Sequence, residues 1–272
     1  ILGTAAAHLL GRGDLALAIL ALLVALSLQV GVNYANDYSD GIRGTDEARV
    51  GPVRLVGQRL AAPSNVKAAA MLSFAAAAMA GLALVGLSEA WIMLPLGALS
   101  VLAAWRYTGG DNPYGYRGLG EVYVFVFFGL MATLGTLYTQ ADAVSWFGLI
   151  GAIGVGALAS AILVANNLRD IPTDIEHGKR TLAVRLGDAR TRALYVALFA
   201  ASVVAVLGMA WFEPWALLGL LAAPLGWTAM RTVRAGTTGR ELIPVLAATG
   251  LYEVAYAVLI ALGVVIGVAI AT

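Results

Sequence analysis

The feature that most constrains the fold is a succession of apolar segments that runs from one end of the chain to the other. The segments cover residues 1–11, 15–36, 65–87, 91–107, 119–139, 146–168, 191–211, 215–230 and 242–269. A helix needs ~20 apolar residues to cross a bilayer, and most segments approach that length. Because 60% of the 272 residues are hydrophobic and only 12% are charged, a soluble domain is excluded. We expect an all-α, polytopic membrane protein with nine transmembrane helices.

Basic residues predict how the helices are oriented. All of the 17 Lys and Arg residues except Arg12 lie in or beside the even-numbered connections between segments. Cytoplasmic connections carry the excess of Lys and Arg, so we expect a cytoplasmic N-terminus and an outside C-terminus. The chain opens with Ile1 inside an apolar run, which predicts that the first helix is truncated at its N-terminal end. We expect residues 1–272 to form a single domain.

A polar cluster ends the second apolar segment in the sequence NYANDYSDGIRGTD, residues 33–46. Asn36 and Asp40 are four residues apart, so on a continuing helix they share a face, one turn apart. Charged carboxylates at the end of a membrane-length segment are unfavourable in free energy. The negative, C-terminal end of the helix dipole disfavours them further. A divalent cation with oxygen ligands would offset this cost. A solvated helix end followed by a glycine turn is the alternative.

The same pattern recurs as ANNLRDIPTD, residues 165–174, at the end of the sixth apolar segment. Aligning Asn36 with Asn166 places Asp40 on Asp170, and Asp174 extends the second copy by one more turn. Internal duplication is common in membrane folds whose site lies between the repeats. We therefore expect the two clusters to form two walls of one site.

Basic residues follow both clusters. Arg49, Arg54 and Arg59 lie after the first, and Lys179 and Arg180 lie after the second. Cations beside a metal–carboxylate site suit an anionic, bridging substrate such as a diphosphate. The alternative is the ordinary excess of positive charge on cytoplasmic loops.

The fourth connection reads WRYTGGDNPYGYRGLGE, residues 105–121, and mixes tyrosines with arginines. Aromatic residues at a membrane interface usually belong to an interfacial belt. Their density in this Gly-Pro loop also suits a lid over a planar ligand or an allylic cation. Glu121 and Glu253 lie in apolar segments, where an acid either marks a functional site or pairs with a neighbouring arginine.

Together these motifs resemble the UbiA superfamily of intramembrane prenyltransferases, which have nine helices and two aspartate-rich motifs on cytoplasmic loops. NDYSD at 36–40 matches the first motif, and NNLRDIPTD at 166–174 with GKRTLAVRLG matches the second. NDYSDGIRGTD and YTGGDNPYGYRGLGE are most similar to the branch that prenylates 1,4-dihydroxy-2-naphthoate for menaquinone synthesis. Many relatives carry an acid four residues after the position of Asp40, where this chain has Gly44; Asp46 is the candidate replacement.

The resemblance implies helices around a central cavity and transfer of a polyprenyl group from its diphosphate to the naphthoate, with loss of CO₂ and diphosphate. It also implies two Mg²⁺ ions, an aromatic acid as the acceptor, and a prenyl tail that lies in lipid, with no nucleic acid as a partner. The expected location is a bacterial cell membrane, with the active site facing the cytoplasm. The catalytic residues would be Asp37, Asp40, Asp170 and Asp174. The metal ligands would be Asn36, Asp37, Asp40, Asp46, Asn166, Asp170 and Asp174. Substrate would contact Asn33, Asn36, Arg54, Tyr107, Tyr116, Arg117, Asn166, Arg169, Lys179 and Arg180.

Two other functions stay open on the sequence alone. The first is the same chemistry on another aromatic acceptor, such as 4-hydroxybenzoate. The second is a secondary transporter that uses the repeated acids as a cation-coupling site. The acids gather at one end of their apolar segments, beside basic loops, and not near the membrane midplane, which argues against the transporter.

Overall fold

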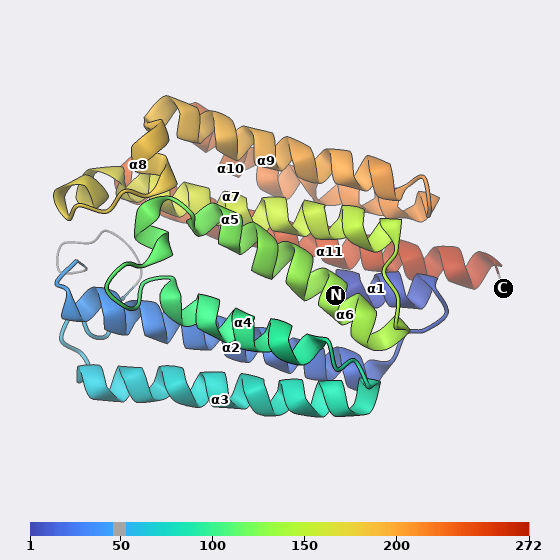
Figure 1. Cartoon of the computed structure of the whole chain (residues 1–272). Helices are drawn as coiled ribbons and strands as arrows, with labels where there is room; N and C mark the ends of the chain where they lie inside the picture. The colour runs from blue at the N-terminus through green and yellow to red at the C-terminus, as the bar shows by residue number, and fades with distance from the viewer. Residues whose placement is uncertain (46–52, 272) are drawn as a thin grey trace.

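The computed structural model describes residues 1–45 and 53–271, and these form helices with no strand among them. In chain order the α-helices are α1 (Leu2–Leu9), α2 (Leu15–Ile42), α3 (Pro63–Ser88), α4 (Met93–Arg106), α5 (Gly120–Val124), α6 (Ala132–Ala141), α7 (Trp146–Glu176), α8 (Leu182–Leu186), α9 (Asp188–Met209), α10 (Ala223–Arg234) and α11 (Ile243–Ala271). Tighter or wider helical turns are η1 (Tyr114–Arg117), η2 (Phe125–Met131), η3 (Pro214–Ala222) and η4 (Gly239–Leu242). Figure 1 shows the helices running roughly alongside one another.

Each apolar segment that the sequence predicted falls on a helical stretch. Seven stretches in the described residues are long and apolar enough to cross a membrane: Leu15–Ile42, Pro63–Ser88, Gly120–Ala141, Trp146–Glu176, Asp188–Met209, Pro214–Arg234 and Gly239–Ala271. The other two are shorter, with 8 residues in α1 and 14 in α4. Large apolar side chains such as Leu15 and Trp211 are exposed, as lipid contact requires. The protein is therefore all-α and polytopic, and nine complete spans stay a prediction.

The helices form two groups with cores of different size. In Figure 1, α2, α3 and α4 lie along one side, and α7, α9, α10 and α11 lie along the other, with α5 and α6 between them. The larger core joins α1, α6, α7, α9, α10 and α11 around buried side chains such as Leu158 and Tyr252. A smaller core cluster in the first group contains the buried side chains Ala35, Ala70 and Phe74.

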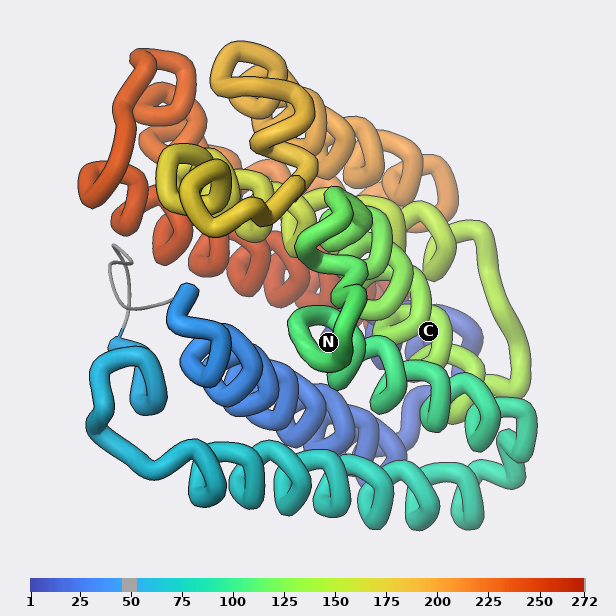
Figure 2. Tube along the Cα trace, turned by 60° about the vertical axis from the view of Figure 1, so that its left-hand side comes forward, coloured from blue at the N-terminus to red at the C-terminus, as the bar shows by residue number. Residues whose placement is uncertain are grey.

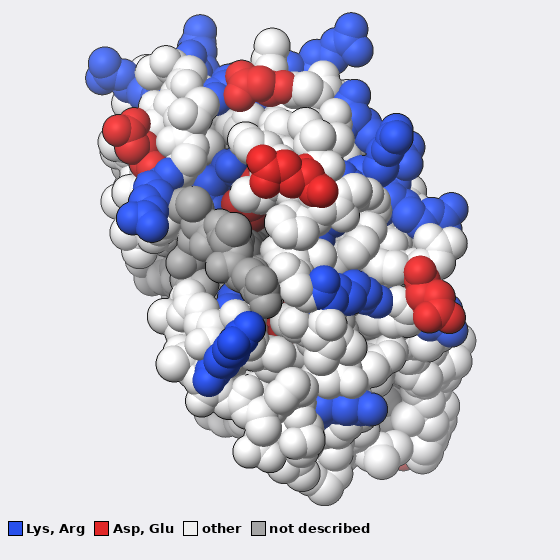
Figure 3. Space-filling view, turned by 90° about the vertical axis from the view of Figure 1, so that its left-hand side faces the viewer, with Lys and Arg blue, Asp and Glu red and all other residues white. Residues whose placement is uncertain are grey.

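The helices that carry the two polar clusters are longer than the hydrocarbon core of a bilayer is thick. At ~1.5 Å per residue, the 28 residues of α2 and the 31 of α7 extend about 42 and 46 Å. The hydrocarbon core of a bilayer is about 30 Å thick, so the last turns of these helices can leave it. Both last turns lie at the same end of the molecule (Figure 2), where Lys and Arg side chains gather (Figure 3).

Close packing of η2 against α7 fixes the position of η2 and of α5, which directly precedes it. A Cβ atom at Gly129, in η2, would overlap the backbone of Gly156 in α7. Small residues at both positions allow the two backbones to touch. The contact holds the α5–η2 stretch directly on α7 and places η1, which precedes α5, beside the end of α7.

Candidate active site

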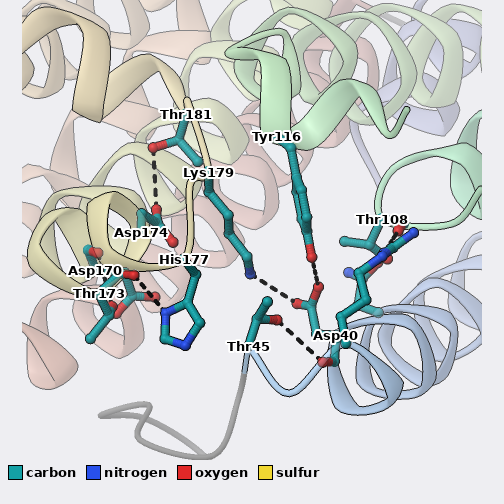
Figure 4. A network of polar contacts seen from close by, with 12 residues as sticks. Asp40, Thr45, Thr108, Tyr116, Asp170, Thr173, Asp174, His177, Lys179 and Thr181 are labelled. Carbon is teal, nitrogen blue, oxygen red and sulfur yellow. Dashed lines mark hydrogen bonds and ion pairs between the residues drawn. The ribbon is translucent and has the colours of Figure 1, made fainter. Parts of the chain in front are cut away.

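Asp40 joins three parts of the chain that are far apart in sequence. It lies in the last turn of α2 and is 5% exposed. One carboxylate oxygen accepts a hydrogen bond from the Tyr116 hydroxyl of η1. The other lies 3.5 Å from Nζ of Lys179, in the loop that follows α7 (Figure 4). The first acidic cluster, the aromatic loop and the second basic loop therefore meet at one carboxylate.

Tyr116 lies between two cations. Nζ of Lys179 is 4.6 Å from the centre of its ring, and Cζ of Arg43 is 5.5 Å from it, both within the range of cation–π attraction. Burial, together with the negative charge of Asp40, raises the pKa of Tyr116 above its ordinary value. The phenol therefore stays protonated at neutral pH and donates its proton to Asp40.

Asp37 holds the segment that follows the first cluster. Its two carboxylate oxygens accept hydrogen bonds from the backbone N–H groups of Leu55, at 2.7 Å, and Val56, at 3.0 Å. The absence of a side chain at Gly41 allows this approach, because a Cβ there would overlap Val56. The carboxylate thereby fixes the backbone beside Arg54, a predicted phosphate ligand.

Asn36 and Arg43 attach the aromatic loop to the end of α2. The Asn36 side-chain oxygen accepts a hydrogen bond of 2.9 Å from the Thr108 hydroxyl. The Arg43 guanidinium donates to the backbone carbonyls of Thr108 and Gly110. The sequence prediction did not include Thr108 or Arg43. Their positions, inside the aromatic loop and three residues after Asp40, are the only signals that pointed to them.

In the second cluster, Arg169 binds two of the three predicted metal-ligating side chains, Asn166 and Asp170. Its Nε and Nη2 atoms lie 2.6 and 2.7 Å from the two carboxylate oxygens of Asp170. Nη2 also donates to the side-chain oxygen of Asn166 at 2.8 Å. Arg169 is 4% exposed, and its Nη1 is buried without a hydrogen-bond partner among the described residues. The guanidinium neutralises the carboxylate in a buried setting.

Asp174 orients the basic loop. One of its carboxylate oxygens accepts a hydrogen bond of 3.2 Å from the Thr181 hydroxyl, and its backbone carbonyl accepts one of 2.8 Å from the Lys179 N–H. Gly178 adopts a positive φ of 69°, which glycine tolerates best, so the chain can reverse directly after α7. This reversal directs the Lys179 side chain toward Asp40 (Figure 4).

The oxygen donors of the two clusters stand apart in two groups. Among residues 1–45 and 53–271, no three His, Cys, Asp or Glu side chains come close enough together to hold a metal ion by themselves. Mg²⁺ commonly takes one or two carboxylates, together with water and the phosphates of its substrate. A divided set of carboxylate and amide oxygens beside cationic loops therefore fits Mg²⁺ bound jointly with a diphosphate. Asp46 lies outside the described residues.

Comparison with known proteins agrees with the interpretation drawn from the geometry of the site. The model of the UbiA prenyltransferase family matches residues 1–242. The chain belongs to this family. A UbiA-family relative, 1,4-dihydroxy-2-naphthoate octaprenyltransferase of Mycobacterium tuberculosis, is 56% identical over 261 residues, which are 96% of this chain and 89% of that protein.

Solved structures of UbiA homologs share the fold. The apo structure of a homolog from Aeropyrum pernix K1 has a TM-score of 0.73 at 18% identity, over 97% of this chain and 94% of that one. A homolog from Archaeoglobus fulgidus, bound to DMAPP and Mg²⁺, has a TM-score of 0.53 at 14% identity, over 95% and 94%. These comparisons confirm the predicted all-α fold.

Three other residues suggested by the UbiA resemblance, Asn33, Arg117 and Arg180, are exposed. The Asn33 amide donates to the Gln29 carbonyl of its own helix. The Arg180 N–H donates to the Tyr116 carbonyl at 2.9 Å. Together with five neighbours the Arg180 side chain lines a pocket of about 240 Å³, and these neighbours are Ile175, Gly178, Lys179, Val184 and Arg185.

Aromatic rings continue from the loop into the helices. Tyr107 meets Tyr114 edge-on at 5.5 Å between ring centres, and Tyr114 stacks on Tyr123 at 3.8 Å.

Nearby, Glu121 is 7% exposed and one of its carboxylate oxygens accepts a hydrogen bond of 2.9 Å from the Asn167 amide. Pairing of Glu121 with an arginine, one of the two interpretations open from the sequence, is therefore wrong. Its partner is an amide because Glu121 faces the side of α7 that bears Asn167.

Proposed function

We propose that the chain transfers a polyprenyl group from a polyprenyl diphosphate to 1,4-dihydroxy-2-naphthoate, with loss of diphosphate and CO₂, as a step of menaquinone biosynthesis. The observation that carries the proposal is the 56% identity to the M. tuberculosis 1,4-dihydroxy-2-naphthoate octaprenyltransferase over 96% of the chain. Family membership alone supports prenyl transfer. Likeness at this level supports the naphthoate as the acceptor.

The arrangement of charges supports a diphosphate substrate. Asp40, Asp170 and Asp174 are buried at one end of the bundle, and Lys179 and Arg180 lie in the loop beside them. With Asn36 and Asn166, these carboxylates are the residues that would hold Mg²⁺; Asp37 and Asp46 complete the proposed set. When bound, Mg²⁺ supplies charge neutralisation on the diphosphate as the allylic C–O bond breaks.

The residues of the chain itself would bind and shield the reacting groups. Lys179, Arg180 and Arg54 would bind the phosphate oxygens that the ions leave free, and so stabilise the leaving group. The rings of Tyr107 and Tyr116, in the loop above the carboxylates, would exclude water from the allylic cation and stabilise it through their faces. Arg117 and Asn33 are proposed to contact substrate at the margin of the site.

The position of the site supports a cytoplasmic orientation. Lys and Arg gather at the end of the molecule where the carboxylates lie (Figure 3), and cytoplasmic surfaces of membrane proteins carry this excess. We place the protein in a bacterial cell membrane with this end in the cytoplasm, where a water-soluble naphthoate would reach it. The chain would act as a single domain.

The test is prenyl transfer by the purified protein in nanodiscs, with farnesyl diphosphate and 1,4-dihydroxy-2-naphthoate, with Mg²⁺ or with EDTA. We expect a product that has gained a farnesyl group and lost CO₂, formed only with Mg²⁺. Product formed only with 4-hydroxybenzoate would leave the reaction type standing and overturn the acceptor. No product with any aromatic acceptor would overturn prenyl transfer and favour a cation-coupled transporter.

A further inference from the structure

Each acidic cluster already holds a cation that belongs to the chain. The Arg169 guanidinium contacts both carboxylate oxygens of Asp170 at 2.6 and 2.7 Å. Nζ of Lys179 lies 3.5 Å from Asp40. All four residues are mostly buried, with exposed side-chain fractions of 0% and 8% for the first pair and of 12% and 7% for the second. The contacts therefore lie in an environment where charges interact strongly.

The contacts of Arg169 compete with metal coordination for the same atoms. Its Nε and Nη2 atoms occupy both oxygens of Asp170, and Nη2 also occupies the side-chain oxygen of Asn166. These are two of the oxygen-bearing side chains through which the second cluster would bind Mg²⁺. A bidentate guanidinium–carboxylate pair has a fixed geometry, so a metal ion that takes the lone pairs used by Arg169 must displace it.

We infer that Arg169 is a built-in counter-ion of the second cluster, exchanged for Mg²⁺ when the diphosphate arrives. A guanidinium displaced by the metal alone would stay buried without its partner, which is strongly unfavourable. A diphosphate removes this penalty, because its oxygens accept the displaced guanidinium in the same forked geometry. The buried Nη1 of Arg169, which lacks a partner among the described residues, is a donor ready for a phosphate oxygen. Metal and diphosphate therefore bind cooperatively, and the same exchange applies to Lys179 at Asp40.

This inference rests on the proposed function, because it takes Asp170 as a metal ligand. It makes a prediction that a merely orienting role for Arg169 does not make. An arginine that only orients Asp170 would help the metal to bind, and its removal would weaken binding. An arginine that competes for Asp170 hinders the metal, and its removal tightens binding.

The experiment measures Mn²⁺, as a paramagnetic stand-in for Mg²⁺, by electron paramagnetic resonance of the free ion in nanodisc samples without diphosphate. We expect Arg169→Met to bind Mn²⁺ at least tenfold more tightly than the unmodified protein. Arg190→Met removes one exposed arginine from the same end of the molecule, and we expect less than a twofold change. The cooperativity between metal and diphosphate is the ratio of the affinities for farnesyl thiolodiphosphate with and without Mn²⁺. We expect this ratio to fall at least tenfold in Arg169→Met and to stay unchanged in Arg190→Met.

Unchanged or weaker Mn²⁺ binding by Arg169→Met would overturn the inference. If Arg169→Met does not fold, Arg169→Lys provides the test, because lysine keeps the charge but cannot bind both carboxylate oxygens at once; we expect at least threefold tighter binding. Asp170→Asn distinguishes failure of the proposed exchange from failure of the proposed metal site. Loss of Mn²⁺ binding in Asp170→Asn without tightening in Arg169→Met would refute the exchange alone. No Mn²⁺ binding by the unmodified protein, with or without the thiolodiphosphate, would refute both the exchange and the proposed metal site.

Discussion

Replacing Asp37 by asparagine tests whether this carboxylate holds the segment that carries Arg54. The side-chain amide of the Asp37→Asn variant would keep one oxygen, so one of the two backbone N–H groups of Leu55 and Val56 loses its acceptor. A hydrogen bond to a charged group contributes about 1.5–3 kcal/mol, and the bond that remains loses its charge assistance, roughly another 1 kcal/mol. We expect the closed form of the segment to lose about 3 kcal/mol, which corresponds to an approximately hundredfold shift toward the open form.

Hydrogen–deuterium exchange of the segment 53–62 measures this shift directly. We expect the Leu55 and Val56 amides to exchange about a hundredfold faster in Asp37→Asn, with helix amides of α3 unchanged. Asp40→Asn is the matched control, because it removes one carboxylate three residues away that accepts no bond from either amide. Equal exchange of these amides in Asp37→Asn and in the unmodified protein would refute the anchoring role and leave Asp37 free for a metal.

Four further predictions concern the site and the packing that holds it. Asp170→Ala should abolish metal-dependent prenyl transfer in the nanodisc assay, and full transfer by this variant would remove Asp170 from the ligand set. Because the pKa of Tyr116 is raised in the folded state, its ionisation opposes folding. The free energy of unfolding should therefore fall more steeply above about pH 10 in the unmodified protein than in Tyr116→Phe, as denaturant titrations at successive pH values would show. Arg192→Met removes charged hydrogen bonds to the carbonyls of Val233 and Thr237; it should cost about 3 kcal/mol in denaturant unfolding and leave transfer per folded molecule unchanged. Gly129→Ala should destabilise the protein by about 1–3 kcal/mol through the clash with Gly156, whereas Gly97→Ala, where a Cβ meets nothing within 4 Å, should not.

Much of the fold could be predicted from the sequence because lipid imposes a simple rule. A helix in a bilayer must satisfy its backbone internally and present apolar side chains outward, so hydropathy alone marks the helical stretches. Helix ends were harder to predict, because polar residues can continue a helix beyond the membrane. The predicted segments ended at Asn36 and Leu168, but α2 and α7 run on to Ile42 and Glu176. Helix α7 even continues through Pro172, which residue preferences alone disfavour.

The contacts of the candidate site could be predicted where they involve repeated side chains, and could not be predicted where the backbone takes part. The repeated Asn-x-x-x-Asp spacing identified Asp40 and Asp170, because both motifs consist of side chains. The partners of Asp37 are backbone N–H groups 18 and 19 residues away, and no residue type marks such donors. Arg169 was predicted to contact substrate; its pairing with the adjacent Asp170 depends on side-chain rotamers that spacing does not specify.

The unequal cores of the two helix groups have a consequence for how the protein holds together. Helices in lipid gain no hydrophobic stabilisation from touching one another, and the smaller core cluster, in the group of α2, α3 and α4, is built on the buried Ala35, Ala70 and Phe74. The contacts of Asp40 with Tyr116 and Lys179 add polar connections between this group and the rest of the molecule. The proposed metal ligand Asp40 thus also connects the two helix groups, and we expect a compound that displaces Lys179 from it both to block the proposed site and to loosen the bundle.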